Sequence, residues 1–209
     1  RDYVVAPATE SLLAMYETLP QRPPAPRVLD AGCGDGCAFE LLARGLLPRS
    51  ITAVEIDPRS VRLAQAAAED CPVKVDLRHG DLAHLDLPDD SIDVVFCHQT
   101  LHHSSDQHAV LAAFRRVLKP GGVLLIAESC RVFIHASWVR TFFRHPMQVQ
   151  RSASEYIALV RNAGFTVREK CIHTSSPWWS LPDLGVRERM GWKGGAEREP
   201  AQVRLVAVS

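Results

Sequence analysis

The sequence lacks several features that would assign it to a specialised class of protein. No stretch approaches the roughly 20 consecutive apolar residues of a membrane-spanning helix, so no membrane span is expected. Basic residues are not in excess, since Lys plus Arg and Asp plus Glu each total 24. Without a global positive field, we do not expect a nucleic-acid partner.

Paired cysteines are also missing. The six cysteines contain no C-x-x-C motif, and most lie within or beside segments with strand or helix patterns. The N-terminal residues show no charged region followed by an apolar core, as a secretory signal would. We therefore expect reduced cysteines, no metal site of the paired-cysteine type, and a cytoplasmic location.

The residues that are present predict one α/β domain. With 209 residues the chain suits a single core, and strand-like and helix-like segments alternate as they do in a parallel sheet. We expect an N-terminal helix and linker over 1–26, a cofactor-binding half over 27–128, and a substrate-side cap with the last strands over 129–209. The predicted strands are 27–31, 51–56, 73–78, 92–98, 122–128, 165–172 and 201–208, and the main helices are 7–19, 37–46, 58–69 and 106–119.

A glycine-rich turn follows the first predicted strand. Gly32, Gly34 and Gly36 alternate with other residues directly after the apolar run that ends at Asp30 and Ala31. Glycine tolerates positive φ and has no Cβ, so such a turn lets a ligand approach bare backbone beside a helix N-terminus. The dinucleotide pattern G-x-G-x-x-G would place its third glycine at Cys37, which disfavours a nicotinamide cofactor.

Acidic residues stand where other predicted strands end. Glu55 ends the second strand, and Asp81 follows the third. Open α/β sheets bind ligands outside the carboxyl ends of their strands, so both carboxylates are candidates for cofactor contacts. Asp57 precedes Pro58 and is better explained as a helix N-cap.

Together these motifs resemble the class I S-adenosylmethionine-dependent methyltransferases over residues 28–128. The Leu-Pro-Asp-Asp-Ser-Ile-Asp run at 87–93, followed by Thr-Leu-His-His at 100–103, is most similar to the methyltransferase type 11 branch, which contains the ubiquinone and menaquinone biosynthesis methyltransferases. The resemblance implies a Rossmann-like fold: a mostly parallel seven-stranded sheet with an antiparallel last strand and helices on both faces. It also implies S-adenosyl-L-methionine as cofactor and S-adenosyl-L-homocysteine as product.

The resemblance further implies the residues that contact the cofactor. Asp30 would lie near the methionine amino group, Glu55 would hold the ribose hydroxyls, and Asp81 would accept from the adenine amino group. The remaining expected contacts are Gly32, Cys33, Gly34 and Gly36 in the turn, Ile56 on the purine face, the Leu82 amide at a ring nitrogen, and His98 and Gln99 beside the sulfonium.

Four histidines lie within eleven residues at the end of the fourth predicted strand: His98, His102, His103 and His108. His102 or His103 could serve as a general base, because imidazole titrates near neutral pH. Alternatively, the pair lines the cofactor pocket or caps the next helix. A metal held by His98 and His102 would need helical backbone at a strand end, so we predict no metal site.

Aromatic residues gather after residue 128. The apolar segment 131–144 has a helix-like pattern, and a long connection from 175 to 200 carries further tryptophans. These side chains could line an acceptor pocket, or they could pack a core. The candidates for the substrate pocket are Phe133, Trp138, Phe142, Trp178 and Trp179.

The sequence thus predicts an S-adenosylmethionine-dependent methyltransferase that acts on oxygen, nitrogen or carbon of a small molecule. Cys97-His98-Gln99-Thr100 stands where adenine and glutamine-amide methylases carry Asn/Asp-Pro-Pro-Tyr, which argues against those substrates. A noncatalytic cofactor-binding scaffold and, with less support, a nicotinamide-dependent oxidoreductase remain as alternatives. The oligomeric state is not indicated.

Overall fold

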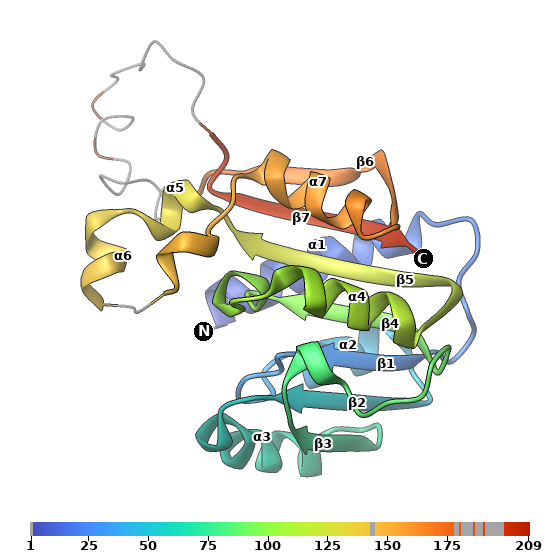
Figure 1. The fold of residues 1–209 in the computed structure, drawn as a ribbon. Helices are drawn as coiled ribbons and strands as arrows, with labels where there is room; N and C mark the ends of the chain where they lie inside the picture. The colour runs from blue at the N-terminus through green and yellow to red at the C-terminus, as the bar shows by residue number, and fades with distance from the viewer. Residues whose placement is uncertain (1, 143–144, 178–179, 181–185, 187–189, 191–198) are drawn as a thin grey trace.

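The computed structural model describes residues 2–142, 145–177, 180, 186, 190 and 199–209. Within these residues, seven strands form one sheet in the order β3-β2-β1-β4-β5-β7-β6 (Figure 1). Neighbouring strands from β3 to β5 pair in parallel, whereas β7 is antiparallel to both β5 and β6. The strands are β1 (Arg27–Ala31), β2 (Ser50–Glu55), β3 (Val75–His79), β4 (Ile92–His98), β5 (Leu118–Ser129), β6 (Thr166–Ser175) and β7 (Gln202–Val208).

Helices cover both faces of the sheet, as the sequence predicts. On one face lie α1 (Asp2–Glu17), α2 (Phe39–Leu46) and α3 (Pro58–Asp70), and on the other lie α4 (Gln107–Val117) and α7 (Ala153–Asn162) (Figure 1). Each face has its own buried cluster, one containing Phe39 and the other Phe114. The inner strand β4 contributes to both clusters, which explains its nearly unbroken apolar run.

The order of the strands places a crevice at the end of β1. From β1 the chain moves outward through β2 and β3, whereas β4 pairs with the opposite side of β1. At such a switch point the connections leave in opposite directions, and the space between them binds ligands. The same edge of the sheet carries the short helices η1 (Leu82–His84), η2 (Leu101–His103), α5 (Arg131–Ile134), α6 (Ser137–Phe142) and η3 (Met147–Val149).

Several boundaries differ from the sequence expectation; the N-terminal helix, for example, spans Asp2–Glu17 where 7–19 is expected. The helix expected to reach residue 119 ends at Val117, and β5 begins at Leu118 and includes the Pro-Gly-Gly segment at 120–122. A register shift in the β4–β5 pairing, with Gly121 at φ 77°, accommodates these residues in the strand. The apolar segment after residue 130 forms two short helices, α5 and α6. No helix among the described residues is long and apolar enough to cross a membrane.

Candidate functional site

The turn after β1 depends on its glycines. Gly32, Gly34 and Gly36 have φ of 78°, 57° and 81°, a region that residues with a Cβ rarely adopt. A Cβ at Gly32 would lie 2.3 Å from Oγ1 of Thr100, whereas a Cβ at Gly34 would meet no atom within 4 Å. The turn therefore packs closely against the segment after β4 at its first glycine and exposes open backbone at its second.

Asp30 lies at the base of this turn and is buried, with 2% of its surface exposed. Its Oδ2 has no hydrogen-bond partner among the described residues. Burial, and then the negative charge of Glu55, raise the pKa of Asp30 to about 8. Buried polar atoms almost always have partners, so this carboxyl group fits the binding of a positively charged or donating ligand group.

Glu55, at the end of β2, is held against the glycine turn. Its Oε2 accepts a hydrogen bond from the Gly34 amide at 2.9 Å, and its Oε1 accepts one from the Asp57 amide at 2.8 Å. Asp57 caps α3 as the sequence predicts, since it accepts from two amides of the first turn. The next residue, Ile56, is 64% exposed and offers an apolar surface beside the Glu55 carboxylate.

Asp81 and Leu82 lie at the same edge, after β3. Asp81 accepts a hydrogen bond from the Ala83 amide at 3.0 Å and caps η1. This bond, helped by contact with His84, outweighs desolvation and holds the pKa of Asp81 below its ordinary value. The Leu82 side chain is buried in the core, so its position is fixed by packing.

His98, the last residue of β4, and Gln99, directly after it, lie on the other side of the crevice. The Nε2 of His98 is buried without a partner among the described residues, and burial lowers the pKa of His98 to about 4. Gln99 has a positive φ of 54°, uncommon for a residue with a side chain. Its side-chain Oε1 accepts a hydrogen bond from the Ser129 hydroxyl at 2.6 Å, and its backbone N–H donates one to the Ala127 carbonyl. These two hydrogen bonds hold this conformation.

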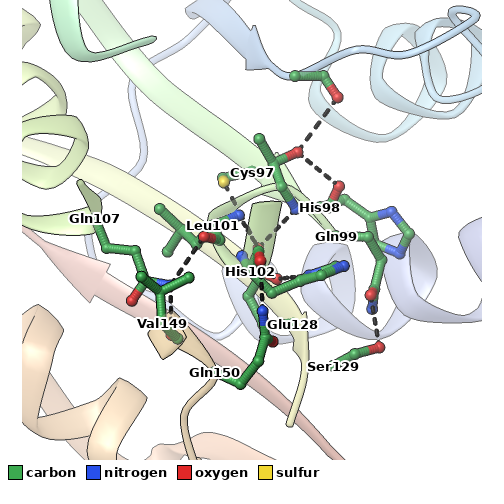
Figure 2. Close-up of polar contacts among 12 residues, drawn as sticks. Cys97, His98, Gln99, Leu101, His102, Gln107, Glu128, Ser129, Val149 and Gln150 are labelled. Carbon is green, nitrogen blue, oxygen red and sulfur yellow. Dashed lines mark hydrogen bonds and ion pairs between the residues drawn. The ribbon is translucent and has the colours of Figure 1, made fainter. Parts of the chain in front are cut away.

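Glu128 is a central residue of the site that the sequence analysis did not single out. It is fully buried near the end of β5, and one oxygen accepts from the amides of Thr100 at 2.9 Å and Leu101 at 2.8 Å. The other oxygen lies 2.6 Å from Nδ1 of His102. Figure 2 shows Glu128 close to two of these partners, Leu101 and His102.

These partners determine the charge of Glu128. Burial alone would raise its pKa, but the hydrogen bond and charge of His102 and the two backbone amides together hold the pKa below its ordinary value. Glu128 is therefore an ionised carboxylate in the core. A signal existed in the sequence, because this acid ends an apolar strand just as Glu55 does.

Two glutamines connect η2 to the segment that follows α6. Gln107 donates to the carbonyls of Leu101 at 2.9 Å and Val149 at 3.0 Å (Figure 2). Gln150 donates to the carbonyls of His102 at 2.8 Å and Pro146 at 2.9 Å. Because each glutamine bridges η2 to the region of η3, the residues near 145 are held against the histidine pair.

The result is a cluster of three histidines. The ring centroids of His102 and His103 lie 4.2 Å apart, and His145 lies 5.3 Å and 4.8 Å from them. Burial and the neighbouring imidazoles lower the pKa of His103 to about 4, although part of its side chain is exposed, and the same causes lower the pKa of His145. Neither His98 nor His108 belongs to this cluster. Its third member, His145, is not among the histidines that the sequence pattern singles out.

The aromatic residues of the cap divide into two groups. Phe133 and Trp138 pack edge to face, with centroids 5.5 Å apart, and Nε1 of Trp138 is buried without a partner among the described residues. Phe142 is 77% exposed. Trp178 and Trp179 lie outside the described residues, so their place in a pocket stays a prediction.

The strand order, the reversed β7 and the open glycine turn at the switch point define the class I methyltransferase fold. Sequence comparison agrees, because a family model described as "Methyltransferase domain" matches residues 29–126. The ubiquinone biosynthesis O-methyltransferase of Xanthomonas oryzae pv. oryzae is 37% identical over 177 residues, covering 79% of this chain and 73% of the relative. The chain belongs to the S-adenosylmethionine-dependent methyltransferases, and its cofactor is S-adenosylmethionine.

Other relatives show how far the likeness extends. A probable S-adenosylmethionine-dependent methyltransferase of Mycolicibacterium smegmatis is 34% identical over 156 residues, which cover 74% of this chain but 58% of that relative. The solved structure of the [4+2]-cyclase SpnF has a TM-score of 0.70 at 21% identity and covers 96% of this chain and 80% of its own. At that identity the likeness shows the fold alone, and the reaction has to be argued from the site.

Proposed function

We propose that the protein transfers a methyl group from S-adenosylmethionine to oxygen, nitrogen or carbon of a small-molecule acceptor. One observation carries the proposal within this family: Asp30 is a buried carboxyl group whose Oδ2 has no hydrogen-bond partner in the described part of the chain, directly below a turn whose backbone is open at Gly34. The methionine half of the cofactor has an ammonium group to offer that oxygen. An ammonium near Asp30 would favour its ionised form.

The other contacts follow the edge of the sheet. Glu55 is oriented by two backbone amides and would hold the ribose hydroxyls, and the exposed Ile56 would pack on the purine. Asp81 and the Leu82 amide would meet the polar edge of the adenine. Gly32, Cys33, Gly34 and Gly36 would form the backbone floor beneath the methionine and ribose.

His98 and Gln99 would border the reactive centre. S-adenosylmethionine supplies an activated methyl group on a positively charged sulfonium. A lowered pKa keeps His98 neutral at pH 7, so that it would not repel this charge. The hydrogen bond from Ser129 fixes the side chain of Gln99 in the same region.

The histidine pair is the proposed source of acid–base chemistry. Glu128 orients His102, in the way that a general base is commonly held by a third group. His102 is only 3% exposed, however, so the exposed His103 is the member that could contact an acceptor. Phe133, Trp138 and Phe142, with Trp178 and Trp179, are the proposed residues of the acceptor pocket.

Calorimetry tests the cofactor assignment. We expect the purified protein to bind both S-adenosylmethionine and S-adenosylhomocysteine, and Asp30→Asn to weaken binding at least tenfold, because it removes a buried charge from the ammonium site. Asp70→Asn, at an exposed position on α3, is the matched control and should bind normally. Equal affinity of the two variants for the donor would contradict the assignment of Asp30.

Turnover distinguishes the proposal from the alternatives. Release of S-adenosylhomocysteine in a screen of phenols, quinols, amines and thiols would establish methyl transfer. Tight donor binding with no product across that panel would favour a noncatalytic scaffold. Quenching of intrinsic fluorescence by NADH and not by the methyl donor would favour an oxidoreductase. The small-molecule acceptor and the cytoplasmic location stay predictions.

A further inference from the structure

We propose that His102, His103 and His145 form a binding site for a divalent transition-metal ion of the kind that prefers imidazole ligands, such as zinc. The three side chains each offer one nitrogen, and these nitrogens all lie within 4.8 Å of one another. The site shares His102 and His103 with the proposed acid–base pair but none of the proposed methyl-donor contacts, and metal binding to it can be measured without any methyl transfer.

The arrangement around His102 fits a metal ligand. Its Nδ1 lies 2.6 Å from the buried Glu128 carboxylate, so Nδ1 carries a hydrogen, and in the neutral ring Nε2 offers its lone pair to a metal. A carboxylate behind the distal nitrogen of a histidine ligand is the usual outer shell of protein zinc sites, where it sets the tautomer and strengthens the ligand. Glu128 is itself fixed by the Thr100 and Leu101 amides.

The backbone holds the other two ligands close to His102. His103 is the next residue of η2, and Gln150 bridges the carbonyls of His102 and Pro146, the residue after His145. Hydrogen bonds from Gln150 to backbone carbonyls, which do not involve the imidazoles, thus hold the segment around His145 next to η2. Such a scaffold would be present before a metal arrives.

The spacing of the rings is compatible with coordination. Around tetrahedral zinc, with Zn–N distances of about 2.0–2.1 Å, ligand nitrogens lie roughly 3.3 Å apart. The three nitrogens must therefore approach by at most about 1.5 Å. Rotation of His103 and His145, which are less buried than His102, can supply this movement. Three histidine ligands leave a fourth position open, as in catalytic rather than structural zinc sites.

Cobalt and zinc titrations of tag-free, chelator-treated protein test the site without any methyl donor. We expect one Co²⁺ per chain with the visible absorption of low-coordinate nitrogen ligation, displaced by one Zn²⁺, and confirmed by metal analysis after dialysis. Failure to bind either ion, or a spectrum dominated by thiolate charge transfer, would overturn the proposal, because six cysteines offer a competing site.

Variants locate the ion. His103→Ala and His145→Ala should each weaken Co²⁺ binding at least tenfold, while His108→Ala and His135→Ala, both at exposed positions nearby, should leave it unchanged. Glu128→Gln should weaken binding by about 10–100-fold through His102. Unchanged binding in folded His103→Ala and His145→Ala would reject the site. Intact S-adenosylhomocysteine binding by these variants would separate this result from the proposed function.

Discussion

Asp30 and Glu128 are two buried acids near the carboxyl ends of strands in one sheet, yet their surroundings are opposite. Asp30 has a pKa raised to about 8 and an oxygen, Oδ2, for which the described residues provide no hydrogen-bond partner. Glu128 accepts from two backbone amides and one imidazole, and its pKa is lowered. The difference shows that burial alone does not indicate function: Glu128 is bonded to the segment after β4, whereas Asp30 Oδ2 has no hydrogen-bond partner among the described residues, which supports the proposal that Asp30 binds a ligand.

Removal of Glu128 should have the largest effect. Glu128→Ala leaves two amides and His102 buried without their acceptor, so we expect a loss of about 3–5 kcal/mol in the free energy of unfolding. Glu128→Gln keeps an acceptor for the amides and should lose less. Chemical denaturation at pH 7 measures both. A loss below about 1 kcal/mol for the alanine variant would show that the network contributes little.

Asp30→Asn should act in the opposite direction in the ligand-free protein. The folded pKa of about 8 exceeds the unfolded value of 3.8, so the wild-type protein loses stability as pH rises from about 4 to about 8. The asparagine variant avoids this loss and should gain on the order of a few kcal/mol relative to wild type by pH 8. Denaturation curves across this range, with Asp70→Asn as control, provide the measurement. A difference independent of pH would contradict the raised pKa.

Binding of the methyl donor should release a proton from Asp30. Near pH 7 the Asp30 carboxyl is largely protonated in the free protein, and an ammonium beside it would lower its pKa. We expect donor affinity to rise between pH 6 and 7.5. Titration calorimetry in two buffers of different ionisation enthalpy should detect release of up to one proton, and Asp30→Asn should abolish it. Affinity that falls over this interval would place the ammonium elsewhere.

The smallest expected effect is that of Glu55→Gln on the pKa of Asp30. Glu55 is the second cause of the raised pKa, after burial, so removal of its charge should lower the pKa of Asp30 by less than about one unit. The pH dependence of stability would shift accordingly toward lower pH. If removal of the Glu55 charge lowered the pKa by more than half of the rise from 3.8 to about 8, repulsion between the two carboxylates, rather than burial, would be the main cause.

Much of the fold, and the region around Asp30, Glu55 and the glycine turn, could be predicted from the sequence because the signals there are local. The glycine turn, Glu55 at a strand end and the Asp57 cap each depend on a few consecutive residues. The contact between Gly34 and Glu55 then follows from the pairing of β1 with β2. The roles proposed for the individual residues stay predictions.

The region around Glu128 and the three histidines could not be predicted in the same way. Glu128 is 26 residues from His102, and His145 is a further 17 residues along the chain. The periodicity of an apolar strand does not reveal which amides its terminal acid will meet. The histidine pair and the acid at the end of the apolar strand were visible in the sequence, but the contact between them and the approach of His145 were not.

The amino-acid pattern alone therefore determined the alternation of strands and helices and the glycine turn after β1, since short-range backbone preferences and hydrophobic periodicity govern them. The cofactor followed from the resemblance of the ordered motifs to a known family. Tertiary packing decided that, among the described residues, one oxygen of Asp30 has no hydrogen-bond partner while both oxygens of Glu128 have one, and that three histidines converge. These arrangements arise because the ends of strands far apart in the sequence come together and glutamines bridge the segments that follow them, which no local sequence pattern indicates.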